Sequence, residues 1–245
     1  MPTVQQVLAE HQQYFRPVPA FRAGSVCTIC RGPVSDYSAC YGCNQLDKAV
    51  GFDFALSGRV VPMSVAPNPG PWYSRLATYK TFHRGYSSVL ASLAYTFLTT
   101  HEAEVEHALG GEMDRITVVP STRGVPPDTQ PLRRVLSLIP PLEEHTAALL
   151  RHVPGQKVGR QEYQPGAFEC VVPVDGQRII LIEDTWVTGA KAVSAAGALL
   201  AAGAENVLIM PMGRMVQPKS GYYPEDHPYF EWIDRPYDFQ HWPLD

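Results

Sequence analysis

The clearest hydrophobic pattern in the chain lies between residues 178 and 203. The apolar run from Ile179 to Ile182 consists of β-branched residues and leucine, and two carboxylates follow it. Such a short unbroken run predicts a strand that is buried on both faces. From Ala190 to Ala202 the chain is rich in alanine and leucine, which favour helix, and Gly203 is placed to end it. This region predicts a strand, an acidic loop and a helix in succession.

Helical and strand-like patterns alternate along the rest of the chain. Apolar residues recur at helical spacing from Ser87 to Leu109, and the run from Ile116 to Val119 predicts a core strand. Because helices and strands alternate, we expect an α/β fold with a mainly parallel central sheet flanked by helices. Further expected elements are an amphipathic segment at Val4–Phe15, a proline-rich connector at 59–71, a helix from Pro131 to Ile139 that resumes over Leu142–Leu150, and a strand at Phe168–Val172.

The acidic loop has the composition of a binding site for a phosphorylated sugar. The first N–H groups of the helix after Gly189 have no partner within the helix and favour an anion. Glu183 and Asp184 lie beside them, at the carboxyl end of the strand, where ligands of α/β sheets bind. Side chains alternate along a strand, so both carboxylates can reach one sugar only if the backbone bends, and we expect that bend. The alternative is a solvated loop in which Thr188 only caps the helix.

Two other phosphate-binding motifs, the P-loop and the Rossmann glycine pattern, are excluded by the sequence. A P-loop requires a second glycine upstream of Gly189 and a hydroxyl residue after the lysine, where this chain has Ala192. No Gly-x-Gly-x-x-Gly pattern follows any expected strand, so a dinucleotide site of the Rossmann kind has no support.

Four of the five cysteines form two Cys-x-x-Cys pairs near the N-terminus. Pairs at this spacing are typical of two knuckles that share one tetrahedral zinc ion. Two disulfides are the alternative, but the chain is long enough to be stable through burial alone, and no signal-peptide pattern precedes the cysteines. We interpret Cys27, Cys30, Cys40 and Cys43 as ligands of a structural zinc ion, and Cys170 as an ordinary buried thiol.

Composition narrows the class of protein. The chain has 245 residues, of which 45% are hydrophobic, and a formal net charge of -4, which argues against broad attraction to nucleic acid. No apolar run reaches the length of a membrane span, so we expect a cytoplasmic protein that does not bind membranes. We expect a zinc module at 1–50, an α/β domain at 72–216 and an aromatic strap at 217–245, whose rings pack on the domain rather than stack on a ligand.

The acidic loop resembles the phosphoribosyl diphosphate (PRPP) motif of type I phosphoribosyltransferases. Glu183, Asp184, Thr188 and Gly189 match its acidic pair and Thr-Gly turn, whereas Val187 and Lys191 stand where the family has threonine. With the cysteine pairs in front, the chain resembles the competence protein ComF family. The segments that carry this second resemblance are Thr78–Lys80 with Gly85, Ile116–Pro120, and Arg160 with Gln161, although residues 121–127 depart from the family's basic segment.

The resemblance implies transfer of phosphoribosyl from PRPP to a nitrogenous acceptor, with Mg²⁺ bound to the diphosphate. The alternatives are a regulator that binds PRPP without turnover and an accessory protein of DNA uptake; a homodimer is possible in each case. The implied catalytic residues are Glu183, Asp184 and Arg123. The implied substrate-binding residues are Thr185, Trp186, Val187, Thr188, Gly189, Ala190, Lys191, Ser121, Thr122, Gly124 and Lys80, with a plain surface turn as the alternative at 121–124.

Overall fold

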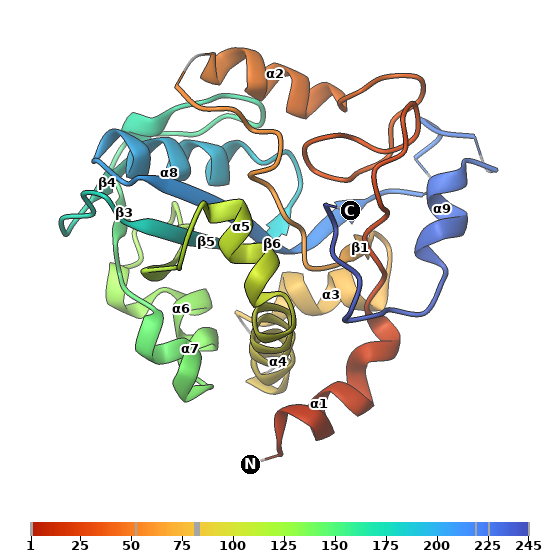
Figure 1. The fold of residues 1–245 in the computed structure, drawn as a ribbon, viewed down its shortest axis with the longest axis horizontal. Coiled ribbons are helices and arrows are strands. Elements are labelled where there is room, and N and C mark those ends of the chain that lie inside the picture. Colours follow the sequence, from red (N-terminus) through yellow and green to blue (C-terminus); the bar gives the residue numbers. More distant parts are fainter. Residues whose placement is uncertain (1, 52, 81–83, 219, 225, 245) are drawn as a thin grey trace.

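The fold is built on a four-stranded parallel sheet with the order β1-β6-β5-β2 (Figure 1). The computed structural model describes residues 2–244 except 52, 81–83, 219 and 225. Residues 1, 219, 225 and 245 of the predicted terminal parts, and residues 81–83 of the predicted α/β domain, therefore lie outside the described residues. The sheet therefore confirms the expected parallel α/β architecture. Its strands are β1 (Val65–Pro67), β2 (Arg115–Val118), β5 (Arg178–Trp186) and β6 (Asn206–Val216).

Helices cover both faces of this sheet (Figure 1). On one face α8 lies against β5 and β6, with α2 outside it, and on the other face α4 runs beneath the sheet. The helices are α1 (Val4–His11), α2 (Tyr41–Val50), α3 (Pro71–Thr78), α4 (Arg84–Thr100), α5 (Glu102–Leu109), α6 (Pro131–Leu136), α7 (Pro140–His145), α8 (Ala190–Ala201) and α9 (Pro228–Ile233).

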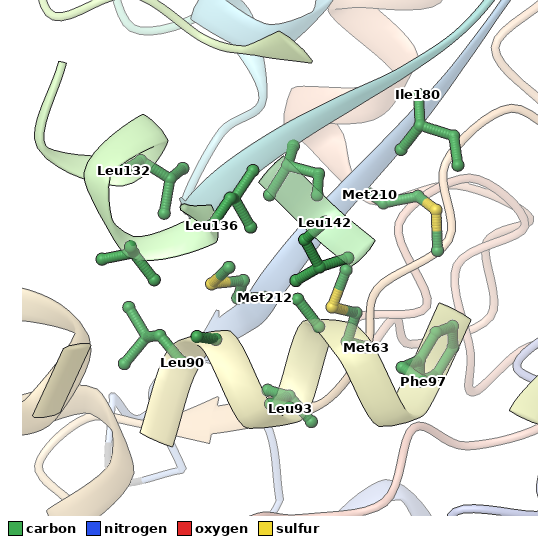
Figure 2. Packing of buried hydrophobic residues seen from close by; sticks show 14 of the residues in the cluster. Met63, Leu90, Leu93, Phe97, Leu132, Leu136, Leu142, Ile180, Met210 and Met212 are labelled. Carbon is green, nitrogen blue, oxygen red and sulfur yellow. The ribbon is translucent and has the colours of Figure 1, made fainter. Parts of the chain in front are cut away.

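Strand β5 separates two hydrophobic clusters because its side chains alternate between the faces. Ile180 and Ile182 belong to the cluster on the α4 face, together with Met210 and Met212 of β6. Figure 2 shows this cluster, to which Leu90, Leu93 and Phe97 of α4 contribute. Ile179 and Leu181 belong to the opposite cluster, which α8 and the cysteine region complete. The predicted burial of this strand on both faces is confirmed.

Three expected elements are different in the structure. The connector 59–71 contains β1, so the main sheet begins before residue 72. No helix spans 142–150, because α7 begins at Pro140 and ends at His145. The strand expected at 168–172 is short and pairs in a separate antiparallel sheet, formed by β3 (Leu150–His152) and β4 (Phe168–Cys170). Single 3-10 turns occur at Gln12–Tyr14, Pro127–Thr129 and Pro165–Ala167.

The aromatic tail packs on the domain, as expected. Tyr229 and Trp242 are buried, and the Tyr237 hydroxyl donates to the carbonyl oxygen of Met63 at 2.6 Å. The Tyr237 ring also meets Phe15 edge-on, with ring centroids 5.4 Å apart. The tail thereby ties the N-terminal segment to the sheet, although part of it forms the helix α9. Among the described residues, no helix combines the length and the apolar character that crossing a bilayer requires.

Candidate functional site: an acid pair, a phosphate loop and a four-cysteine cluster

The four cysteines near the N-terminus form one compact cluster. All four Sγ atoms lie within 4.8 Å of one another, and the Cys30 and Cys40 Sγ atoms are 3.8 Å apart. Cys27 and Cys30 are fully buried, and all the cysteines are free thiols. The cluster brings together Cys27 and Cys30 with Cys40 and Cys43, at the start of α2.

This geometry fits a tetrahedral metal site. Zinc–sulfur bonds of about 2.3 Å imply sulfur–sulfur separations of about 3.8 Å at a tetrahedral ion, which matches Cys30 and Cys40. Two N–H donors also point at the sulfurs: the Cys40 amide donates to Cys27 Sγ at 3.3 Å, and Arg214 Nε donates to Cys30 Sγ at 3.1 Å. Donors around metal-bound thiolates are a common outer shell of such sites. The cluster can therefore bind a metal ion and is compatible with structural zinc. The fifth cysteine, Cys170, is only partly buried.

Strand β5 is irregular at the acid pair. Its register with β6 is kept from Arg178 to Trp186, but Asp184 and Met212 are skipped in the pairing. Strict alternation after Ile182 would place Trp186 on the α4 face, whereas Trp186 belongs to the opposite cluster. The alternation therefore changes phase near Asp184, at the point where we expected a bend.

The loop predicted to bind phosphate, residues 185–191, is called the phosphate loop below, and its turn depends on Gly189. This glycine is the residue before α8 and has a left-handed conformation, with φ at +84°. A Cβ atom at this position would overlap the Trp186 ring, which is fully buried beneath the loop. No side chain caps the helix, so Thr188 does not act as its cap. The N–H groups at the start of α8 are left without intrahelical acceptors, as an anion site requires.

The two carboxylates of the acid pair have different surroundings. Asp184 accepts a hydrogen bond from the Tyr79 hydroxyl at 3.0 Å and forms an ion pair with Lys80 at 2.5 Å. One oxygen of Glu183 is buried without a hydrogen-bond partner among the described residues. Burial, followed by the charge of Asp184, raises the pKa of Glu183 to about 8, against the opposing effects of Lys191 and Lys80. Burial and Asp184 also raise the pKa of the Tyr79 hydroxyl, so it stays protonated and donates to the carboxylate.

The loop after β2 is held in shape by Gln130. The buried Gln130 side chain accepts from the Ser121 amide at 2.9 Å and donates to the Val125 carbonyl at 2.7 Å. The Arg123 amide donates to the Ser121 hydroxyl at 3.3 Å. Gly124 has φ at +72°, which turns the chain back toward Gln130. The exposed Arg123 side chain is thus carried on a fixed turn at the carboxyl end of β2.

Two cavities meet at the acid pair. The α8 cavity, of about 660 Å³, is lined by the phosphate loop, and the β2 cavity, of about 280 Å³, is lined by the turn after β2. Glu183, Asp184, Lys80 and Lys191 line both. Of the predicted residues, Thr185, Val187, Thr188, Gly189 and Ala190 also line the α8 cavity, and Ser121, Thr122 and Arg123 also line the β2 cavity. Trp186 and Gly124 do not line either cavity; they support the two turns.

Several residues of the site were not predicted from the sequence. Tyr79 and Gln130 support the acid pair and the β2 turn. Asn68 and Gln217 line the α8 cavity at the ends of β1 and β6, and Tyr73 of α3 lines it as well. The Asn68 amide donates to the Val216 carbonyl at 2.8 Å, which holds these two strand ends together. The available signal was the proline-rich stretch around Asn68, which could have been interpreted as the end of an edge strand.

The charges around the two cavities suit an anionic ligand. Lys80, Arg160 and Lys191 line the α8 cavity, and Arg123 adds a further cation in the β2 cavity. Lys191 is in the first turn of α8, where the helix dipole disfavours a cation unless an anion is also bound there.

A comparison with protein-family models, curated proteins and solved structures finds no match to this chain. The chemistry of the site is therefore interpreted from its own residues.

Proposed function

We propose that this protein binds PRPP and transfers its phosphoribosyl group to a nitrogenous acceptor. The observation that carries the proposal is the convergence of two segments far apart in the sequence, residues 119–123 and 183–191. They meet at the carboxyl ends of the neighbouring strands β2 and β5, and they line two cavities that share an acid pair and two lysines. Ligands of open parallel sheets bind at this edge.

Each part of PRPP has a matching group in the site. The start of α8, with Lys191, would bind the 5-phosphate, because amide donors and an ammonium both favour a phosphate. Glu183 and Asp184 would bind the ribose hydroxyls. At pH 7 a carboxyl with a pKa of about 8 is mostly protonated, so Glu183 can donate as well as accept a hydrogen bond. Arg123 and Lys80, in the β2 cavity, would bind the diphosphate.

The reaction would break the bond between C1 of the ribose and the diphosphate oxygen and form a bond from C1 to the acceptor nitrogen. Positive charge develops on the ribose ring, and the carboxylate of Asp184 can stabilise it. Negative charge develops on the departing diphosphate, which Arg123 and Lys80 can stabilise. Mg²⁺, when bound to the diphosphate, would add charge stabilisation through oxygen ligands. The four-cysteine cluster ahead of such a site supports the ComF-like type of phosphoribosyltransferase.

A second candidate function is binding of PRPP without turnover, as in a regulator. Asp184 is already engaged by Lys80 and Tyr79, so ribose must compete with an ion pair of 2.5 Å. The loop also has Val187 and Lys191 at two positions where the resembling family has threonine hydroxyls. Tight binding with slow chemistry would be the result if the ion pair were kept when the ligand is bound.

Magnesium-dependent release of diphosphate from PRPP tests the proposal. We expect release with at least one member of a panel of purine and pyrimidine bases, and a loss of about a hundredfold in Asp184→Asn, because the loss of one preorganised electrostatic contact costs this much. Asp47→Asn, on the exposed face of α2, is the matched control and should behave as the wild type. Saturable binding of PRPP without diphosphate release would instead support the regulator. Absence of both would refute the proposal.

A further inference from the structure

Arg214 is a buried arginine that lies between the cysteine cluster and the phosphate loop. It belongs to β6 and is paired in register with Val65 of β1 and Trp186 of β5. Met210 and Met212 of β6 face α4, but the alternation of side chains along the strand changes after Met212. The side chain of Arg214 therefore points toward the cysteines. Only 8% of Arg214 is exposed, so each of its N–H donors needs a partner within the protein.

The guanidinium of Arg214 contacts both neighbours. Its Nε donates to Cys30 Sγ at 3.1 Å. Its Nη1 donates to the carbonyl oxygens of Trp186 at 3.3 Å and Val187 at 3.4 Å, and also to that of Met215. Gly32, between the two cysteine pairs, leaves room for the guanidinium, since a Cβ atom there would lie 2.6 Å from Nη2. The cysteine cluster and the phosphate loop are thus joined through one side chain.

The charges of this arrangement match. A divalent metal ion bound by four thiolates has a net charge of about -2, and a buried cation beside it compensates part of that charge. The guanidinium of arginine stays protonated in proteins, so Arg214 brings a positive charge to within 3.1 Å of Cys30 Sγ. A lysine could not replace it, because a single ammonium lacks the planar fork that spans a sulfur and two carbonyls.

We propose that Arg214 is a positioning residue that couples the metal centre to the phosphate loop. The hydrogen bonds from Arg214 to the Trp186 and Val187 carbonyl oxygens would fix the turn before Gly189. The hydrogen bond to Cys30 Sγ would fix the position of the guanidinium. Metal binding and anion binding at the start of α8 should then stabilise each other, since coupling between two sites is reciprocal. The inference rests on the proposed function in one respect, the binding of a phosphate at this loop.

The test measures zinc release to a chromophoric chelator, with and without saturating ribose 5-phosphate. In the wild type the ligand should slow zinc release about fivefold or more. In Arg214→Lys, release without ligand should be about tenfold faster, because outer-shell partners contribute this much to metal affinity, and ribose 5-phosphate should have no effect on it. Arg151→Lys, in an exposed ion pair with Glu169, is the matched control and should behave as the wild type.

Hydrogen exchange separates positioning from a general loss of stability. In Arg214→Lys, exchange should rise at residues 187–191, whereas β5 upstream of Glu183 should keep its protection. Exchange that rises evenly over the sheet, or wild-type zinc release in the variant, would overturn the coupling. If the wild type binds no ribose 5-phosphate, the proposed function fails. The coupling can then still be tested by removing zinc from the wild type, which should raise hydrogen exchange at residues 187–191. No effect there would overturn it as well.

Discussion

At the scale of single residues, Glu183 makes the site testable through pH. Its pKa of about 8 in the folded protein compares with 4.5 for an ordinary glutamate, because the carboxyl is buried next to Asp184. The folded protein keeps a proton that the unfolded chain releases. The contribution of this proton to the free energy of unfolding is fully present below pH 4.5 and is lost as the pH rises through about 8. We expect wild-type stability to fall over this window relative to Glu183→Gln, which cannot ionise.

The measurement is the urea midpoint of both proteins across the window from pH 4.5 to 8. Glu169→Gln is the matched control, because Glu169 is half-exposed and lies in a surface ion pair with Arg151. The difference in urea midpoint between Glu169→Gln and the wild type should change little over the same pH window. A difference between the wild type and Glu183→Gln that is independent of pH would contradict the burial of an unpartnered carboxyl at this position.

The predictability of individual residues depends on how local their signal is. The cysteine pairs and the Glu183–Lys191 loop carry their chemistry in short spacings, so the sequence was sufficient to identify the four-cysteine cluster and part of the lining of both cavities. Arg214 and Gln130 act through contacts that only the fold creates; Arg214 is separated from Cys30 by 184 positions. Trp186 was predicted as a ligand-binding residue, but its position next to the loop could not show that its ring is buried.

At the scale of elements, the start of α8 is tested by Gly189→Ala. The new Cβ would overlap the Trp186 ring, so the turn must move, and the affinity for ribose 5-phosphate measured by calorimetry should fall about tenfold or more. Gly58→Ala is the matched control, since Gly58 has φ at +77° but no atom within 4 Å of an added Cβ. Both variants carry backbone strain of about 1–2 kcal/mol, and only the first should lose binding. Equal affinities in the two variants would show that the turn does not position the ligand.

Long periodic elements could be predicted and short ones could not. The helix expected from Ser87 to Leu109 is present as α4 and α5, separated at His101, and Gly110 ends it in a left-handed conformation. Strand β1 was missed because it has three residues with prolines around it, and its strand character comes from pairing with β6. The expected helix over 142–150 failed because apolar residues there contribute to two different elements, α7 and β3.

At the scale of the whole molecule, the three parts expected in succession are interleaved. The cysteine region shares a hydrophobic cluster with α8, which is on one face of the sheet. The tail returns to the α4 face, where Trp242 packs near Phe97 with ring centroids 6.0 Å apart. Strand β1, upstream of residue 72, completes the edge of the sheet. These arrangements require contacts between distant segments, which no local pattern encodes. They bring the four-cysteine cluster, the acid pair and the turn after β2 into one molecule-wide arrangement.

The central claim is that the loop before α8 binds the phosphate of a phosphorylated sugar that the acid pair also holds. Calorimetry with PRPP and Mg²⁺ tests it most directly, on the wild type, on Lys191→Ala and on Lys48→Ala, an exposed lysine of α2. We predict saturable binding in the wild type and in Lys48→Ala, and affinity weaker by about tenfold or more in Lys191→Ala, because a charged hydrogen bond to phosphate is lost. No heat of binding in the wild type, or equal affinities in all three proteins, would contradict the claim.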